Sequence, residues 1–278
     1  MRVGLIGMGE MGAGCARRLI AQGYEVSGCD PDSARAEAAR QAGVSVLADP
    51  AAVAKAADSV VILIVGTVQH AEAACLGPAG CLPDMKSKVL VVMSSLNPDF
   101  VQRLEREAES RGGLLVDATM GSGQIQAAEG SMLVMVSGKP VARAAALPVL
   151  EELADHPEVV GDWAGAAQVM KMITQITLNV NMVAMVESIR LANHFGLDRR
   201  QTVKVVGRSP GASFVSENWP MLAEVMKPHN VGNNHKDLRA ALRLAVDNDI
   251  ETPGLAAATN AFRHEWPVDP DEYSFTDS

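Results

Sequence analysis

Three polar side chains lie in a line within an otherwise apolar segment, and one of them could transfer a proton. Lys171, Gln175 and Asn179 stand four residues apart in Gly165–Leu197, so on a helix they share one face. Apolar residues occupy nearly every other face, a pattern typical of a helix that is buried on most sides. A charged amine near the start of such a helix requires a partner or a chemical task. Judged alone, a lysine at a solvated first turn explains Lys171 equally well.

One long helix is predicted for this segment, because it runs far beyond three turns and contains no proline. A membrane-spanning role is not expected, since these polar residues and Glu187 lie within it and polar sequence flanks it. A helix this apolar needs other helices around it, so we expect it to organise the rest of the chain.

A glycine pattern near the N-terminus predicts a turn that binds phosphate. Gly7, Gly9 and Gly12 follow the apolar run 2–6 and open a helical pattern. In this setting the first glycine permits a tight turn, the second lets the backbone approach a pyrophosphate, and the third allows close packing of helix and strand. The pyrophosphate would lie on free N–H groups at the helix N-terminus. The pattern alone is weak evidence, but its strand–turn–helix context favours dinucleotide binding.

Asp30 ends the next predicted strand and bears on the choice of cofactor. A carboxylate at this point accepts hydrogen bonds from ribose hydroxyls and repels a 2′-phosphate, which favours NAD over NADP. Arg35 and Ser33 keep NADP open, because together they could hold a phosphate. Asp30 could also serve in a simple turn and helix cap, a role that is compatible with ribose binding.

Strand-like and helix-like segments alternate from the N-terminus to about residue 161. Such alternation predicts right-handed strand–helix–strand units, a parallel sheet, and ligands at the carboxyl ends of the strands. Four segments follow predicted strands and should line one crevice: 7–12, 66–68, 94–95 and 117–123. The last is dense in small residues whose N–H groups could hold a carboxylate, although a flexible turn explains it better without further context.

Beyond residue 161 the chain is predicted to be helical throughout. The expected organisation is a doubly wound Rossmann-type α/β domain, residues 1–161, followed by an all-helical domain, residues 162–278, built on the long helix. Residues 266–278 are acidic and contain proline, which indicates a loose tail. Because a small domain cannot cover so apolar a helix alone, we expect a homodimer or homotetramer formed through the helical domain.

Composition argues against several classes of function. A formal net charge of −9 disfavours nucleic acid and anionic membrane as partners, since both require a basic face. The four cysteines show neither CxxC nor zinc-ligand spacing and the six histidines are scattered, so no metal site is predicted. The pattern of cysteines and an N-terminus unlike a signal peptide favour a cytoplasmic protein with reduced thiols.

Four motifs, in order along nearly the whole chain, resemble those of the β-hydroxyacid dehydrogenases, the group of 3-hydroxyisobutyrate dehydrogenase. The family's cofactor signature is similar to GLIGMGEMGAGCARRLIAQGYEV, and its substrate motif to VDATMGSGQIQAAEGSMLVMVSG. Its catalytic motif resembles GAAQVMKMITQ, and its late Lys-Asp-Leu helix resembles HKDLRAALRLA. The first motif occurs in many Rossmann proteins, whereas the four together are specific.

The resemblance implies reversible hydride transfer between NAD(H) and a small β-hydroxyacid or its semialdehyde or ketone. It assigns Lys171 as the acid/base, segment 121–123 to the substrate carboxylate, Ser95 to the nicotinamide ribose and Lys236 to the cofactor cleft. A lysine can do this near neutral pH only if burial or a nearby cation lowers its pKa from the usual ~10.4. The candidate site residues are Lys171 and Gln175 for catalysis; Gly121, Ser122, Gly123 and Thr174 for the substrate; and Gly7, Met8, Gly9, Glu10, Met11, Gly12, Asp30, Val65, Gly66, Thr67, Ser95 and Lys236 for the cofactor.

Departures from the family pattern concern the substrate more than the reaction. Thr174 and Gln175 replace two asparagines, Gly121-Ser122-Gly123 replaces Ser-Gly-Gly, and Thr119 replaces a proline. These changes leave a second enzyme class open, imine or keto reduction of a bulkier substrate, although related imine reductases usually carry another residue in place of Lys171. A third alternative, a protein that binds NAD without catalysis, is disfavoured by the retained lysine.

Overall fold

The computed structural model describes residues 1–121, 124–225 and 228–263, and the chain divides into two compact units between Lys171 and Met172. This division lies inside the long helix α8 (Ala166–His194), later in the chain than the boundary expected at residue 161. The first turn of α8 belongs to the first unit because hydrogen bonds tie it to the sheet there.

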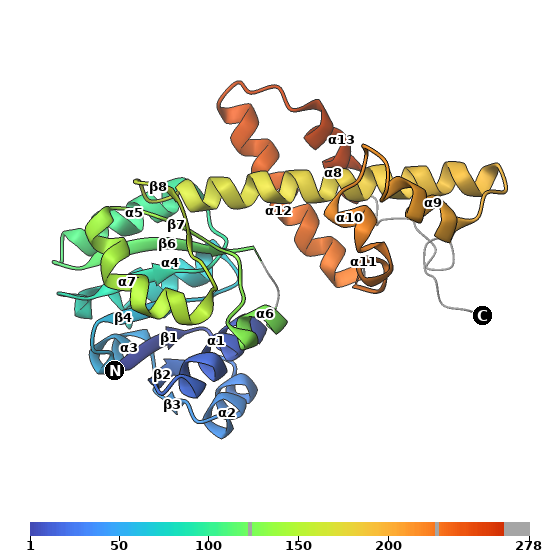
Figure 1. Cartoon of the computed structure of the whole chain (residues 1–278). Coiled ribbons are helices and arrows are strands. Elements are labelled where there is room, and N and C mark those ends of the chain that lie inside the picture. The colour runs from blue at the N-terminus through green and yellow to red at the C-terminus, as the bar shows by residue number, and fades with distance from the viewer. Residues whose placement is uncertain (122–123, 226–227, 264–278) are drawn as a thin grey trace. The chain divides into compact units, whose positions relative to one another are not determined.

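The first unit alternates strands and helices as the sequence predicts (Figure 1). In chain order its elements are β1 (Arg2–Ile6), α1 (Glu10–Ala21), β2 (Glu25–Cys29), α2 (Ser33–Gln41), β3 (Ser45–Val46), α3 (Pro50–Ala56), β4 (Val60–Leu63), α4 (Val68–Leu76), the 3₁₀ turn η1 (Leu82–Asp84), β5 (Val89–Val92), α5 (Pro98–Glu109), β6 (Leu114–Met120), α6 (Gln124–Glu129), β7 (Val134–Ser137), α7 (Pro140–Leu153) and β8 (Glu158–Gly161).

One eight-stranded sheet runs through the described residues of this unit, in the order β3-β2-β1-β4-β5-β6-β7-β8. The chain winds from β1 to one edge and then from β4 to the other, so the predicted doubly wound Rossmann fold is confirmed. Paired strands are parallel with one exception: β6 runs antiparallel to β7, with Asp117 opposite Ser137. The sequence places 117–123 after a predicted strand, but β6 continues to Met120 because residues 117–120 pair with β7.

Helices cover both faces of the sheet, and the central strands are buried on both sides. Successive side chains of a strand point to opposite faces. Ile62 accordingly packs in the core formed with α1, α6 and α7, whereas its neighbour Leu63 packs in the core formed with α3, α4 and α5. All four cysteines are buried free thiols in these two cores.

The second unit is helical, as predicted (Figure 1). After α8 it comprises α9 (Arg199–Val206), α10 (Phe214–Glu217), α11 (Trp219–Val225), α12 (Pro228–Asp247) and α13 (Pro253–Arg263). α10 and α11 are separated at Asn218, and α12 begins at Pro228. The expected loose tail, 266–278, lies outside the described residues.

α8 is less covered than its composition predicts. One apolar cluster joins its C-terminal half to α9, α10 and α11, and another joins its N-terminal half to α12 and α13. Only 22% of its most apolar window is buried, and the side chains of Ile173 and Leu191 are 48% and 62% exposed. The prediction that α8 is buried on most faces is wrong for a single chain, because its short neighbours cover it only in part.

α8 also meets the length and composition of a membrane-crossing helix, with 29 residues and a mean hydropathy of 1.3. Core helices of soluble proteins have the same properties. The polar residues Lys171, Gln175 and Asn179 lie within it, which disfavours a lipid environment.

Candidate active site

The glycine turn between β1 and α1 has a conformation that side chains would prevent. Gly7 has a φ of +99°, and a Cβ atom on it would lie 2.0 Å from the carbonyl oxygen of Ile64. A Cβ atom on Gly12 would lie 2.0 Å from the carbonyl oxygen of Gly7. A Cβ atom on Gly9, by contrast, would meet nothing within 4 Å. Two glycines are thus needed by the fold itself, while the third leaves space beside the backbone.

That space adjoins the N-terminus of α1, where Gly9 is the cap residue and no side chain caps the first turn. The first N–H groups of a helix have no intrahelical partner and carry a partial positive charge. An uncapped helix N-terminus beside open space fits the pyrophosphate of a dinucleotide. Around it, Met8 is buried, Met11 is partly buried and Glu10 is exposed.

Asp30, directly after β2, is hydrogen-bonded to the backbone of the glycine turn. Its Oδ2 atom accepts a hydrogen bond from Met8 N at 2.7 Å, and its Oδ1 atom accepts one from Asp32 N at 2.9 Å. A carboxylate has about four acceptor positions, so these two bonds leave capacity for ribose hydroxyls. Arg35, which the sequence offers as a phosphate ligand, forms an exposed ion pair with Asp32 at 3.8 Å.

The turns after β4 and β5 are bonded to each other. Ser94 Oγ accepts a hydrogen bond from Val65 N at 2.7 Å. Thr67 Oγ1 accepts one from His70 N at 3.1 Å and so caps α4, while Gly66 is exposed. Ser95 is exposed between two buried residues, Ser94 and Leu96. The predicted cofactor residues of these two turns therefore lie side by side at the carboxyl edge of the sheet.

Asp117 on β6 is fully buried and binds the start of α8. Its Oδ2 atom accepts hydrogen bonds from Gly165 N at 3.0 Å, Gln168 N at 3.2 Å and Ser137 Oγ at 3.2 Å. Its Oδ1 atom accepts one from Gln168 Nε2 at 2.7 Å. The carboxylate thereby satisfies N–H groups that the first turn of a helix leaves without an intrahelical partner.

Gln168 extends this network to the turn after β5. Its Oε1 atom accepts a hydrogen bond from Leu96 N at 2.8 Å, and its Nε2 atom donates one to Ser94 O at 3.1 Å. Thr119, which stands where the family usually has proline, donates from Oγ1 to Ala167 O at 2.9 Å. Asp117 and Thr119 on β6, together with the turn after β5, thus hold the first turn of α8.

This network was not predicted from the sequence. Its partners are 20 to 74 residues apart in the chain, so no local pattern joins them. The available signal is chemical: Asp117 follows the apolar run 114–116 and Gln168 lies in an apolar helix, and a buried polar group must find a partner.

Burial raises the pKa of the Asp117 carboxyl from 3.8 to about 6. Desolvation is the largest cause, and it outweighs the hydrogen bonds from Gln168, Gly165 and Ser137, each of which lowers the pKa. Burial thus disfavours the ionised carboxylate, relative to its state in water, by more than these hydrogen bonds favour it.

Lys171 lies on α8, one turn after Gln168, and is partly buried. Further along, Gln175 Nε2 donates to Asp237 Oδ2 at 3.4 Å, and Asn179 Nδ2 donates to Gln175 O at 2.8 Å. Gln175 and Asn179, the second and third residues of the predicted polar line, therefore form hydrogen bonds within the helical unit. Thr174 is partly buried on the same helix.

The remaining predicted residues lie in three places. Gly121 directly follows β6, and its N–H donates to Leu133 O at 2.7 Å, so this amide already has a backbone partner. Ser122 and Gly123 lie outside the described residues. Lys236 lies on α12 and is exposed. Among the described residues, no group of three His, Cys, Asp or Glu side chains is arranged to hold a metal ion.

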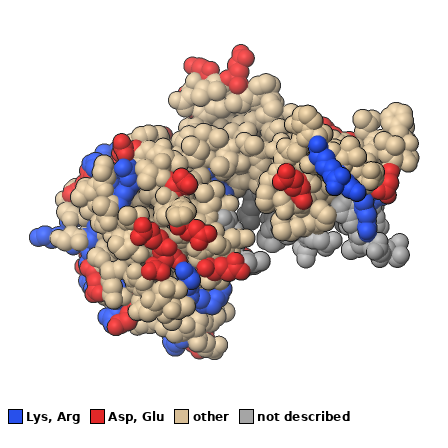
Figure 2. Space-filling view, in the orientation of Figure 1, with Lys and Arg blue, Asp and Glu red and all other residues tan. Residues whose placement is uncertain are grey.

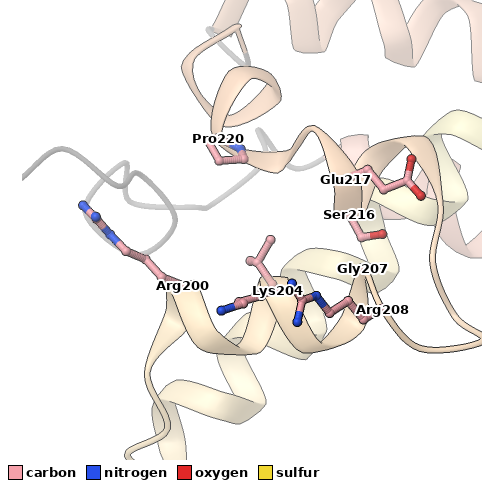
Figure 3. A pocket seen from close by; sticks show the side chains of 8 residues that line it. Arg200, Lys204, Gly207, Arg208, Ser216, Glu217 and Pro220 are labelled. Carbon is pink, nitrogen blue, oxygen red and sulfur yellow. The ribbon is translucent and has the colours of Figure 1, made fainter.

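A hollow of about 650 Å³ occurs in the helical unit, and none of the residues that line it is a predicted site residue. Figure 3 shows Arg200, Lys204 and Arg208 on one side of it and Ser216 and Glu217 on another. Figure 2 shows acidic and basic side chains interspersed over the first unit and basic side chains gathered over α9. The hollow is open and its basic side chains are exposed, which describes a solvated surface rather than a catalytic centre.

Comparison with known proteins identifies the class of the fold and then the family. Residues 2–172 match the family described as the NAD binding domain of 6-phosphogluconate dehydrogenase. Residues 165–266 match the NAD-binding domain of NADP-dependent 3-hydroxyisobutyrate dehydrogenase. Together these matches define a nicotinamide-dependent oxidoreductase with a nucleotide-binding unit and a helical unit.

Individual relatives give the same result. L-threonate dehydrogenase of Cupriavidus necator is 31% identical over 94% of this chain and 89% of its own length. 2-(Hydroxymethyl)glutarate dehydrogenase of Eubacterium barkeri is 27% identical over 94% and 88%. The structure of Mycobacterium tuberculosis 3-hydroxyisobutyrate dehydrogenase with L-serine matches with a TM-score of 0.84 at 25% identity, over 99% of this chain and 96% of that one.

The chain belongs to the β-hydroxyacid dehydrogenase family, as the four sequence motifs predict. It is accordingly an NAD(P)-dependent dehydrogenase. The glycine turn fits this cofactor, because the open space at Gly9 and the uncapped N-terminus of α1 are what a pyrophosphate requires.

Two glycine variants should separate folding from cofactor binding. Gly12→Ala forces a methyl group against the Gly7 carbonyl and should lower the free energy of unfolding by about 1–3 kcal/mol, the usual cost of overpacking. Gly9→Ala adds a methyl group in open space, so it should leave the Tm nearly unchanged and weaken NADH binding about tenfold or more. Thermal unfolding and NADH fluorescence titration measure the two effects. Equal losses of stability in both variants would contradict this assignment.

Asp117→Asn should change how the free energy of unfolding depends on pH. Because the pKa of Asp117 is raised from 3.8 to about 6, the folded protein binds this proton more tightly than the unfolded chain does. The stabilising effect of the proton is complete below about pH 4 and is lost as the pH rises through 6. The stability of wild type relative to Asp117→Asn should therefore fall by about 3 kcal/mol between pH 4 and 7.

Urea unfolding at several pH values measures this difference, and Asp155→Asn, which changes an exposed carboxylate, is the matched control. Parallel pH curves for wild type and Asp117→Asn would show that Asp117 carries the same charge in the folded and unfolded states.

Proposed function

We propose that the enzyme transfers a hydride reversibly between NAD(H) and a small β-hydroxyacid or its semialdehyde or ketone, with Lys171 as the acid/base. Family membership supports the reaction class. The observation that carries the residue assignment is the placement of Lys171 one turn after Gln168, whose amide binds the backbone on both sides of Ser95. The candidate proton donor thus belongs to the same unit as the candidate cofactor residues other than Lys236.

Each residue has a distinct task in this proposal. The bound nicotinamide supplies the hydride. Lys171 donates a proton to the forming alkoxide during reduction and accepts one from the hydroxyl during oxidation. Gln175 and Thr174 orient the hydroxyl. Segment 121–123 holds the carboxylate through the Ser122 hydroxyl and the N–H groups of residues 122 and 123, since the Gly121 N–H donates to Leu133 O.

The cofactor residues follow the same division. The first turn of α1 binds the pyrophosphate, and Asp30 accepts hydrogen bonds from the adenosine ribose, which favours NAD over NADP. Val65, Gly66, Thr67 and Ser95 support the nicotinamide half, and Lys236 faces the cofactor. The carboxylate at Asp30 is the reason for the NAD preference, since a 2′-phosphate would be repelled there.

We also propose a cytoplasmic homodimer or homotetramer formed through the helical unit. The support is the apolar surface of α8, which the single chain covers only in part and where Ile173 and Leu191 are exposed. Exposed apolar surface of this extent favours association with a second copy. The buried, free state of all four cysteines is compatible with a reducing compartment.

Lys171→Ala should lower kcat by about 10²–10⁴, the usual contribution of a positioned acid or base. NADH binding should change little, because the pyrophosphate and ribose contacts remain. Stopped-flow absorbance at saturating substrate measures the first quantity, and fluorescence titration the second. Lys204→Ala, which removes an exposed lysine from another helix, α9, is the control and should keep wild-type turnover. Wild-type turnover in Lys171→Ala would remove this lysine from the mechanism.

The same assay distinguishes the competing activities when it includes NAD, NADP, several β-hydroxyacids and cyclic imines without a carboxylate. The proposal predicts the highest kcat/KM for a hydroxyacid with NAD. A cyclic imine reduced best would instead favour imine reduction, and saturable NAD binding without any turnover would favour a non-catalytic protein.

Leu191→Arg should dissociate the oligomer, because it places a charge on the exposed apolar surface of α8. Light scattering at micromolar concentration should give a multimer for wild type and a smaller species for the variant. Val141→Arg, at a 61% exposed apolar residue of the first unit, is the matched control and should not change the mass. A monomeric wild type would refute association through the helical unit.

A further inference from the structure

We propose that Gln168, held by Asp117, is a positioning residue that sets where Lys171 lies relative to the turn that carries Ser95. This inference rests on the proposed role of Lys171 as the acid/base. It assigns to Gln168 no contact with substrate or cofactor, only control of the geometry between two residues that have such contacts.

The side-chain amide of Gln168 forms two hydrogen bonds with the turn after β5. Its Oε1 atom accepts a hydrogen bond from Leu96 N at 2.8 Å, and its Nε2 atom donates one to Ser94 O at 3.1 Å. These two backbone groups flank Ser95 on either side. One side chain from α8 therefore fixes the peptide segment that presents the exposed Ser95 hydroxyl.

Asp117 in turn holds Gln168 in place. The Asp117 carboxylate accepts hydrogen bonds from both Nε2 and N of Gln168, at 2.7 and 3.2 Å. The two Nε2 hydrogens then each have an acceptor, Asp117 Oδ1 and Ser94 O, and Oε1 has a donor. Rotating the amide by 180° would set donor against donor at Leu96 N, so one orientation is strongly preferred. The side chain is 2% exposed, which leaves no room for water to replace a lost bond.

Lys171 lies three residues after Gln168 on α8. Residues three apart on a helix are neighbours on the same face, so the Lys171 side chain projects from the turn that Gln168 anchors. Thr119 Oγ1 binds Ala167 O at 2.9 Å, the carbonyl to which the N–H of residue 171 bonds in a regular helix. A shift of this first turn moves the lysine amine with it, and a displacement of 1 Å can cost about a hundredfold in rate.

A buried anchor with no influence on catalysis is the alternative, and a double-mutant cycle distinguishes the two. Gln168→Met keeps the length of the side chain and removes the amide. If Gln168 acts through Lys171, the variant should lower kcat about 10- to 100-fold in the wild-type background. It should lower kcat less than about threefold when Lys171 is already alanine, because there is no amine left to misplace.

Three further readouts accompany the cycle. NADH affinity should stay within about threefold, since the pyrophosphate and ribose contacts are intact. Hydrogen exchange of the segment around Leu96 should become faster, because its N–H loses the Oε1 acceptor. Val149→Ala, a large-to-small change in a buried α7 residue outside the network, is the stability control, and it should lower the Tm without changing kcat.

Gln168→Glu keeps the inference testable if Gln168→Met does not fold. The carboxylate form has no donor for Asp117 or Ser94 O, whereas the protonated form has one O–H donor and restores one of these two hydrogen bonds. The loss in kcat relative to wild type should therefore be smaller at low pH than at high pH.

The outcomes separate this inference from the proposed function. Equal losses from Gln168→Met in both backgrounds, or wild-type turnover of Gln168→Glu at all pH values, would overturn the positioning role. Wild-type turnover in Lys171→Ala would instead overturn the proposed acid/base, whatever the effect at Gln168.

Discussion

The burial of one carboxylate determines how the nucleotide-binding unit is joined to the start of α8. Asp117 is removed from water at the end of the parallel part of the sheet, and its charge is tolerated because four donors converge on it. Three of those donors belong to Gly165 and Gln168. The desolvation cost of the carboxylate and the unsatisfied N–H groups of a helix N-terminus therefore compensate each other. The antiparallel strand β7 contributes Ser137, which makes this exception to the parallel sheet part of the same arrangement.

A second carboxylate, that of Asp30, likewise accepts hydrogen bonds from backbone N–H groups. Asp30 accepts the N–H of Met8, so it orders the glycine turn before any ligand is considered. Gly7 and Gly12 are required by backbone contacts, and only Gly9 is left beside open space. The preformed turn and the anchored helix mean that the candidate pyrophosphate site and the candidate proton donor are each held by buried or backbone hydrogen bonds. Rigid support of this kind is what positioned acid/base chemistry requires.

The helical unit is organised by a different force. Its two apolar clusters cover parts of α8, while residues such as Ile173 and Leu191 remain exposed. The free energy gained by hydrophobic burial is roughly proportional to the apolar area removed from water, so the proposed association would stabilise this unit further. The basic hollow beside α9 has the opposite character, since its charged side chains are solvated.

The sequence by itself determined the doubly wound order, the long helix, the glycine turn and the family. These features depend on local periodicity, on glycine at fixed spacing, and on motifs that each occupy a short stretch. It did not reveal the bonds from Asp117 and Gln168, nor the use of the Gly121 N–H by Leu133 O. Those pairings join residues that are distant in the chain. Only the tertiary structure decides them, because a buried polar group takes whichever partner the packing brings within reach.

The same distinction explains the error over α8. Apolar residues on nearly every face correctly predicted a helix that avoids water, but they cannot say whether the covering surface comes from the same chain. That depends on how far short neighbouring helices extend over it, which is a property of the packed molecule. Residue types and spacing therefore determine the chemistry available to this protein, and packing determines which of those groups are held in place.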